Sequence, residues 1–393
     1  MNIMILGAGV YQVPLIRKAK AMGHKTLVVS PKGNYPGLDI ADIIIDCDTR
    51  DKEAVLSAAT RFCIDGIVTT GTDVAVPTIG YVVDQLNLHG TGFESSLKSM
   101  DKSRMKECFL ENNIRTAEYR VVQSLNELKS AAIEMGYPLM VKAVDSSGSR
   151  GVTKVDSEFG LEAAYKESLS VSTVQDVIVE QYLSGYEIGA QAIVNGCDVE
   201  DVFLHSDIVT PPPISVPIGH AMPLDISVTI ADKTKALIKE AIKALGIQDS
   251  ISNIDIMIVD EEPYILEIGA RMGATCLPEN ISIYNRFDVY EFLINLALGL
   301  RPKLVISPVK QPNAAMLICS DKTGTIEKII IPDSVYQNEN LIDLSLDVSV
   351  GDRVSKFNVG PDRIGQIITF GETEFEAIKI AQELMNKIII SVK

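Results

Sequence analysis

The sequence lacks the features that mark redox, zinc-knuckle and membrane-spanning proteins. Its six cysteines are scattered without any C-x-x-C spacing, so neither a redox pair nor a zinc knuckle is predicted, and we expect reduced thiols. No stretch stays apolar for about 18 residues, which argues against a membrane-spanning helix. The first residues carry no basic region followed by a cleavage site. We therefore expect a cytoplasmic protein.

Positive charge is also scarce. Lysine and arginine number 36 against 52 aspartates and glutamates, which gives a formal net charge of -16. Such a charge repels phosphate backbones and anionic lipid surfaces, so neither nucleic acid nor a membrane is an expected partner. An anionic nucleotide can bind only where local lysines and backbone amides overcome the global field.

What is present indicates a folded protein of several domains. Hydrophobic residues make up 46% and charged residues 22%, and 393 residues exceed what one hydrophobic core usually organises. We find no internal repeat. We predict three parts, which are an N-terminal α/β domain over 1–95, a central domain over 96–300 with a lid at about 115–185, and a small α+β unit over 301–393.

The N-terminal part alternates apolar runs with helical stretches, which predicts a doubly wound parallel sheet. It opens with a strand at Asn2–Leu6, a helix at Val13–Met22 and a second strand at Thr26–Ser30. Gly7 and Gly9 begin a possible dinucleotide fingerprint, but its third glycine is replaced by Gln12. A tight turn is therefore favoured over a nicotinamide site.

A lysine-bearing strand follows the predicted helices at Ser99–Asn112 and Leu125–Met135. Lys142 lies within the apolar run Leu139–Val144, where an ammonium is costly to bury without an anion. The next loop offers glycines, hydroxyls and backbone amides, a combination that binds phosphates. The alternative is a lysine that reaches solvent from an edge strand beside a simple turn.

Two carboxylates are predicted to face each other on a later hairpin. With a turn at Asp260–Pro263, the register places Asp255 opposite Glu267, with Glu267 on the same face as Ile265. Opposed like charges need a cation, and Mg²⁺ typically takes one or two carboxylates plus substrate phosphates. A solvated pair of surface acids is the alternative. Arg271 suits bidentate binding of a phosphate or carboxylate.

Two further segments are candidates for substrate binding. The strand Val177–Leu183 ends in a segment able to hydrogen-bond a flat heterocycle, and Glu187 beyond it can accept hydrogen bonds from ribose, although a lone glutamate is more often solvent-facing. His220 lies in Pro217–Pro223, rich in proline and glycine and read as a loop. It either faces the substrate or is a structural or exposed histidine.

Taken together, four motifs in this order resemble the ATP-grasp superfamily across nearly the whole chain. They are Met100–Ser103, Tyr137–Lys142 with its Ser/Gly loop, Val179–Leu183 with Glu187, and Asp255 with Leu266–Arg271. The Glu-Ile-Gly-Ala-Arg pattern at 267–271 is similar to the branch of amino-acid and dipeptide ligases. The resemblance implies an ATP-grasp fold between an N-terminal α/β domain and a small closing domain.

The resemblance also implies a role for each candidate residue. Lys102 and Lys142 would contact ATP phosphates, the loop from Ser146 would cover them, and the segment from Glu180 would bind adenine, with Glu187 on the ribose. Asp255 and Glu267 would bind one or two Mg²⁺ ions, with Mn²⁺ as an alternative, while Arg271 would steady the transferred phosphate or the acyl phosphate. His220 is a catalytic candidate from its position in the sequence. The loop and adenine residues are Ser147, Gly148, Ser149, Gly151, Glu180, Gln181, Tyr182 and Leu183.

One departure from the family pattern concerns the metal. Many members have asparagine two residues after the last metal glutamate, whereas this chain has Gly269, which leaves the number of metal ions open. The implied reaction activates a small-molecule carboxylate as an acyl phosphate that an amine captures. Alternatives are a bicarbonate-activating carboxylase, although no biotin-carrier segment is visible, and a nucleotide-binding regulator without turnover. A homodimer is expected by analogy with the family.

Overall fold

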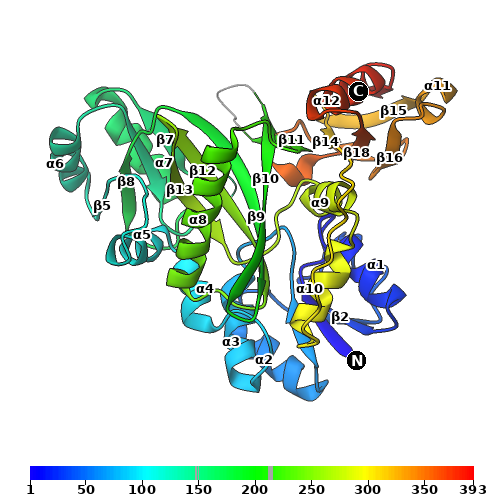
Figure 1. Ribbon diagram of the computed structural model, residues 1–393, viewed down its shortest axis with the longest axis horizontal. Coiled ribbons are helices and arrows are strands. Elements are labelled where there is room, and N and C mark those ends of the chain that lie inside the picture. Colours follow the sequence, from blue (N-terminus) through cyan, green and yellow to red (C-terminus); the bar gives the residue numbers. More distant parts are fainter. Residues whose placement is uncertain (147, 149, 211–215) are drawn as a thin grey trace. The chain divides into compact units, whose positions relative to one another are not determined.

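The computed structural model (Figure 1) describes residues 1–146, 148, 150–210 and 216–393. The chain divides into two compact units. Unit 1 comprises Met1–Thr72, Phe203–Ile226 and Met272–Lys393. Unit 2 comprises Asp73–Val202 and Ser227–Arg271. The domain limits predicted at residues 95 and 300 stay predictions.

Unit 1 begins with the predicted parallel sheet, whose strand order is β3-β2-β1-β4. Its elements are β1 (Asn2–Leu6), α1 (Val13–Ala21), β2 (Lys25–Ser30), β3 (Ile43–Asp46), α2 (Lys52–Arg61) and β4 (Gly66–Val68). The inner strands are almost wholly buried, which explains their continuous apolar runs. The expected turn after β1 is present, and Gln12 closes it by accepting a hydrogen bond from Gly9 N at 2.9 Å.

The rest of unit 1 is an antiparallel sheet covered by helices on both faces. Its strands run in the order β10-β11-β14-β18-β16, and the last residues of β10 belong to this unit. Ala315 and Leu317 pack on the face that carries Ile283 of α9, while Met316 packs on the face that carries Leu384 of α12. A three-stranded sheet, β17-β15-β19, completes the unit. The bounds are β10 (Asp198–Val209), β11 (Pro217–Met222), α9 (Leu277–Asn285), α10 (Val289–Ala297), β14 (Asn313–Ile318), β15 (Gly324–Ile330), α11 (Asp333–Tyr336), β16 (Leu341–Leu346), β17 (Arg353–Val354), β18 (Gly365–Phe370), α12 (Glu374–Met385) and β19 (Ile389–Val392).

Unit 2 contains two antiparallel sheets and six helices among its described residues. One sheet has the order β5-β8-β6-β7, and the other is formed by β13-β12-β9 and the first residues of β10. The bounds are α3 (Val76–Leu86), α4 (Phe93–Met100), α5 (Lys102–Glu111), β5 (Tyr119–Val122), α6 (Leu125–Met135), β6 (Leu139–Ala143), β7 (Val152–Val155), α7 (Leu161–Val171), β8 (Val177–Gln181), β9 (Tyr186–Asn195), α8 (Val228–Leu245), β12 (Ser250–Val259) and β13 (Glu262–Gly269).

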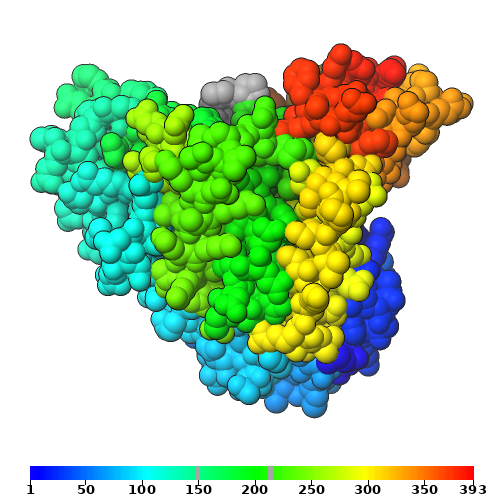
Figure 2. All heavy atoms as spheres, viewed as in Figure 1, coloured from blue at the N-terminus to red at the C-terminus, as the bar shows by residue number. Residues whose placement is uncertain are grey.

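The long helix α8 covers the apolar side of the second sheet. Ile238 and Ile242 of the helix are fully buried, as are Ile254 and Ile256 of β12. The opposite side of α8 carries exposed residues such as Lys239, and the helix lies at the surface in Figure 2. One face of the sheet therefore packs in the core, and the other face can carry polar side chains.

The single helix predicted over Ser99–Asn112 is wrong, because the chain breaks at Asp101. Helix α4 ends at Met100, and Asp101 adopts an extended conformation with φ -98° and ψ 113°. Its carboxylate accepts hydrogen bonds from Ser103 N at 2.8 Å and Arg104 N at 3.2 Å, so it caps the new helix α5. The break places Lys102 at the first position of α5.

All six cysteines are free thiols, and two of them, Cys108 and Cys276, are buried. Among the described residues, no helix combines the length and the apolar character that crossing a membrane requires.

Candidate active site

The second sheet of unit 2 presents a row of carboxylates on its polar face. Asp255 pairs with Glu267 on β13, and Met257, two residues along the same strand, pairs with Glu187 on β9. Cross-strand partners point to the same face, and so do residues two apart. Glu187, Asp255 and Glu267 therefore share the face opposite the buried isoleucines.

The predicted pairing of Asp255 with Glu267 is confirmed, but it arises in a different way. The turn has only two residues, Asp260 and Glu261, both with positive φ as the tight turns of hairpins require. A β-bulge at Leu266 then shifts the register by one residue. The bulge also turns Glu267 to the face opposite Ile265, so the prediction that these two residues share a face is wrong.

Lys102 reaches this carboxylate pair from the start of helix α5. Its Nζ lies 3.1 Å from Glu267 Oε1 and donates a hydrogen bond to the Ser146 carbonyl oxygen at 2.6 Å. Only 7% of the side chain is exposed. The lysine is therefore fixed between the acidic pair and the beginning of the predicted phosphate loop.

Lys142 on β6 has the anionic partner that its burial requires, and that partner is Glu180 of the neighbouring strand β8. Lys142 Nζ lies 2.7 Å from Glu180 Oε2. The other oxygen, Oε1, lies 3.5 Å from Nζ of Lys106, a buried lysine of α5 that also donates to Thr116 Oγ1 at 2.5 Å. Two lysines thus flank one carboxylate that is 2% exposed.

The protonation states of this cluster follow from burial and charge. Burial would raise the pKa of Glu180, but the ammonium groups of Lys142 and Lys106 hold that pKa at about 2. Burial lowers the pKa of Lys106 to about 8, although Glu180 opposes the shift. Burial would also lower the pKa of Lys142, but Glu180 and Glu267 raise it above its ordinary value. Glu180 is ionised and Lys142 is charged at neutral pH.

The predicted phosphate loop begins at Ser146, whose Oγ is buried and has no hydrogen-bond partner among the described residues. Ser147 and Ser149 lie outside the described residues. Gly148 and Gly151 both have φ +66°, and a Cβ on Gly151 would collide with Val171. Position 151 therefore requires glycine, because its φ is positive and because a side chain there would collide with Val171.

The predicted adenine segment follows Glu180 at the end of β8. Gln181 is exposed, and its backbone N donates to the Glu118 carbonyl at 2.8 Å. The Tyr182 ring lies beneath the Lys154 ammonium, 4.4 Å from the ring centre. Leu183 is partly buried and Glu187 is exposed. The adenine and ribose roles of this segment stay predictions.

Arg271 makes a bidentate ion pair with Asp73, and its contact with a substrate phosphate or carboxylate stays a prediction. Arg271 Nε and one terminal nitrogen each lie 2.7 Å from an oxygen of Asp73. A Cβ at Gly269 would lie 3.0 Å from Asp73 Oδ1. The glycine that departs from the family pattern therefore leaves room for this carboxylate.

Sequence reasoning missed both Lys106 and Asp73. A lysine in a helix is usually a solvated residue, so only the packing of α5 against Glu180 distinguishes Lys106. Asp73 follows β4 by five residues, and polar residues just after the strands of a parallel sheet are common in sites. That position was the one available signal for Asp73.

The prediction that His220 lies in a loop is wrong, because the residue lies in strand β11 of unit 1. Its side chain is 5% exposed and its Nδ1 lies 2.6 Å from Asp207 Oδ1. The other predicted site residues belong to unit 2. The substrate role of His220 stays a prediction.

Comparisons with known proteins agree with this geometry. Residues 101–275 match the ATP-grasp domain, and residues 316–393 match the L-amino acid ligase C-terminal domain 2. The chain is 23% identical to a formate-dependent phosphoribosylglycinamide formyltransferase of Wolinella succinogenes over 86% of each chain.

Two solved structures extend the comparison to the whole chain. The crystal structure of phosphoribosylglycinamide synthetase from Anaerococcus prevotii is 31% identical, with a TM-score of 0.84 over 100% of this chain and 99% of that one. The L-amino acid ligase from Bacillus licheniformis, at 19% identity and a TM-score of 0.83 over 100% of this chain and 98% of that one, shares the fold. The chain belongs to the ATP-grasp family and is an ATP-dependent ligase of the carboxylate–amine type.

Proposed function

We propose that unit 2 binds ATP with Mg²⁺ on the polar face of β9, β12 and β13, and that the enzyme joins a small carboxylate to an amine through an acyl phosphate. The observation that carries this proposal is the pair Asp255 and Glu267, opposed on neighbouring strands with Lys102 against Glu267. Like charges in that register are unfavourable unless a cation lies between them.

The residues of this face fit a magnesium ion. Carboxylate oxygens are the ligands that Mg²⁺ prefers, and the ion usually takes one or two of them together with phosphate oxygens. Asp255 and Glu267 would hold it, and it would neutralise charge on the phosphates when bound. Asp73, which Gly269 accommodates, supplies a further carboxylate beside Arg271.

The lysines supply the remaining positive charge. An ammonium has three N–H donors, so Lys142 can bind Glu180 and a phosphate oxygen at the same time. Lys102 can likewise bind Glu267 and a phosphate oxygen at the same time. Lys106 is fully buried against Glu180, and we assign it to holding that carboxylate in place.

The reaction that we propose has two balanced steps. A carboxylate oxygen of the substrate attacks the γ-phosphorus of ATP, and ADP leaves with the bridging oxygen. The amine then attacks the acyl carbon, loses a proton, and expels phosphate that retains one oxygen of the original carboxylate. Exclusion of water from the site would protect the acyl phosphate, which water otherwise hydrolyses.

We propose that an amino acid is one of the two substrates. The match of residues 316–393 to an L-amino acid ligase domain supports this choice. The relative from Wolinella succinogenes is named a formate-dependent phosphoribosylglycinamide formyltransferase, so a small carboxylate as the other substrate is in keeping with the family. A homodimeric state and a cytoplasmic location are further proposals that rest on the family and on the sequence.

The experiment is to supply purified enzyme with MgATP and pools of amino acids and small carboxylates, with and without bicarbonate, and to measure phosphate and product mass. We expect phosphate together with a product one water lighter than its two substrates. Glu267→Gln should lower kcat by roughly 100-fold or more, because charge stabilisation of the transferred phosphate is lost. Glu261→Gln, in the exposed turn of the same hairpin, is the matched control and should leave kcat unchanged.

Two outcomes would contradict the proposal. Phosphate release that requires bicarbonate would make the enzyme a carboxylase instead. Equal activity of Glu267→Gln and Glu261→Gln would remove the acidic pair from the mechanism.

A further inference from the structure

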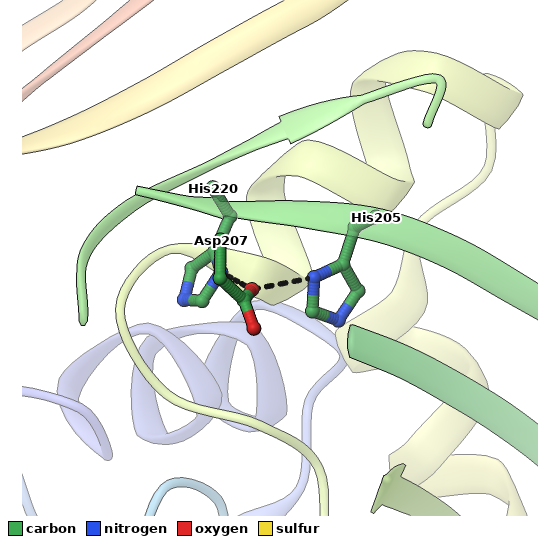
Figure 3. A group of neighbouring side chains, drawn as sticks. All are labelled: His205, Asp207 and His220. Atoms are coloured by element: carbon green, nitrogen blue, oxygen red, sulfur yellow. Dashed lines mark hydrogen bonds and ion pairs between the residues drawn. The ribbon is translucent and has the colours of Figure 1, made fainter. Parts of the chain in front are cut away.

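Strands β10 and β11 of unit 1 bring three side chains together that the proposed reaction does not use. Asp207 on β10 pairs with His220 on β11, and His205 lies two residues before Asp207 on the same strand. All three side chains therefore point to one face of the sheet. Figure 3 shows both imidazole rings turned toward the Asp207 carboxylate.

The three groups are close and shielded from solvent. Oδ1 of Asp207 lies 3.0 Å from His205 Nδ1 and 2.6 Å from His220 Nδ1. One ligand-type atom from each residue lies within 4.8 Å of the other two. The histidine side chains are 2% and 5% exposed, and Asp207 is 14% exposed. The His205 and His220 rings meet edge to face, 5.1 Å apart.

The composition of this cluster is that of a transition-metal site. Two imidazole nitrogens and one carboxylate oxygen form a three-ligand set for Zn²⁺, with a fourth position for water. The sequence has only four histidines, and two of them meet here on rigid strands. Mg²⁺ and Ca²⁺ prefer all-oxygen ligands, so the set selects against the ion proposed for unit 2.

The present spacing needs little change to admit an ion. Bonds of about 2.0 Å in a tetrahedral site separate ligand atoms by roughly 3.3 Å. The distance from Asp207 Oδ1 to His205 Nδ1 is a few tenths of an ångström shorter than this separation. The distance from Asp207 Oδ1 to His220 Nδ1 is shorter by a larger amount. The terminal torsion of an aspartate is soft, so rotation of the Asp207 carboxylate can open both contacts without moving the strands.

We propose that His205, Asp207 and His220 bind one divalent transition-metal ion of the zinc and cobalt class. The ion links β10 to β11 at the level of His220, and β11 in turn pairs with β14. Its role is to fix these strands in unit 1. The site is separate from the carboxylate pair of unit 2 in residues and in ligand type.

The test uses the full-length protein after treatment with a chelator. Co²⁺ is added and its visible absorption is recorded, because tetrahedral Co²⁺ absorbs strongly and octahedral Co²⁺ weakly. We expect saturation at about one equivalent, displacement of the band by Zn²⁺, and a Zn²⁺-dependent rise in Tm. His205→Gln and His220→Gln should each weaken binding by roughly 10-fold or more.

Three controls keep the result interpretable. Asp207→Asn retains an amide oxygen that accepts hydrogen bonds from the imidazoles, so it should fold and yet bind Co²⁺ weakly. His89→Gln removes a half-exposed histidine of unit 2, and Asp255→Asn removes a carboxylate of the proposed magnesium pair. Both should keep the band.

The inference is overturned if the wild type gives no tetrahedral band. It is also overturned if the band keeps full strength in Asp207→Asn and both histidine variants, or if it disappears only in Asp255→Asn. Circular dichroism of each variant verifies folding before the metal is added.

Discussion

At the scale of single residues, Glu180 compensates two buried lysines. Lys142 lies 2.7 Å and Lys106 lies 3.5 Å from its oxygens. Glu180→Gln keeps the shape of the side chain but leaves both ammonium groups without their carboxylate. We expect the free energy of unfolding to fall by about 3 kcal/mol or more. Urea unfolding measures this, with Glu107→Gln on the exposed side of α5 as the control that should change little.

Glu180 should make the free energy of unfolding depend on pH in a definite direction. The pKa of Glu180 is about 2 in the folded chain against 4.5 ordinarily, so its stabilising effect is complete above pH 4.5 and is lost as the pH falls toward 2. The difference in unfolding free energy between wild type and Glu180→Gln should therefore shrink on acidification. Urea unfolding of both proteins from pH about 7 to about 3 gives this difference. A difference that grows at low pH would contradict the charge assignment.

Asp73 is a positioning residue for Arg271 in this account. Asp73→Asn replaces a carboxylate that makes two 2.7 Å contacts with the guanidinium by an amide that can accept only one of them well. We expect kcat to fall roughly 10- to 100-fold with a smaller change in the KM for ATP. Steady-state kinetics separate the two constants. A change confined to the KM for ATP would point to nucleotide binding instead.

Some of these residues could be predicted from the sequence and others could not. Lys142, Asp255 and Glu267 could be predicted from the sequence. Each is a charged residue within a predicted strand of mainly apolar residues, where a charge is unusual. Lys106 could not, because a lysine in an amphipathic helix is ordinary until its tertiary partner is known. Asp73 is far from Arg271 in sequence, and nothing short of the fold brings them together.

At the scale of elements, the start of α5 depends on Asp101. Its carboxylate caps two backbone N–H groups of the helix that begins with Lys102. Asp101→Ala should cost about 1 kcal/mol of stability, whereas Asp101→Ser, which can also cap, should cost much less. Chemical unfolding of the two variants distinguishes loss of the cap from loss of charge. Equal losses in both variants would show that charge matters instead.

The hairpin β12–β13 shows why element boundaries were harder to predict than element types. Both strands were predicted, but a bulge at Leu266 has no clear sequence signature, and it decides the face of Glu267. The break between α4 and α5 was missed for a related reason. Asp101 lies in a helical pattern on both sides, and only its extended backbone reveals the cap.

At the scale of the whole molecule, ligand binding should be visible as stability. If MgATP binds the folded chain alone, ATP at 100 times its Kd adds about 2.7 kcal/mol to the free energy of unfolding. Lys142→Met should lose most of this increment, while Lys129→Met on the exposed side of α6 should keep it. The increment is measured within each variant, so a lower starting stability does not affect the comparison. An equal increment in both variants would show that Lys142 does not contribute to nucleotide binding.

The overall architecture was more predictable than the site. The alternation of strands and helices indicated the N-terminal parallel sheet, and the order of four motifs indicated the ATP-grasp fold, which the comparisons confirm. The His205–Asp207–His220 cluster was not predicted. His220 was read as part of a loop because proline and glycine surround it, although it pairs within a sheet.

The proposed reaction depends on the activation of a substrate carboxylate as an acyl phosphate. The most direct measurement supplies MgATP, the amine and a carboxylate fully labelled with ¹⁸O, and determines the mass of the released phosphate. Attack of the carboxylate on the γ-phosphorus predicts one ¹⁸O atom in each phosphate and one in each amide product. Unlabelled phosphate, or release of AMP and pyrophosphate, would rule out the acyl phosphate.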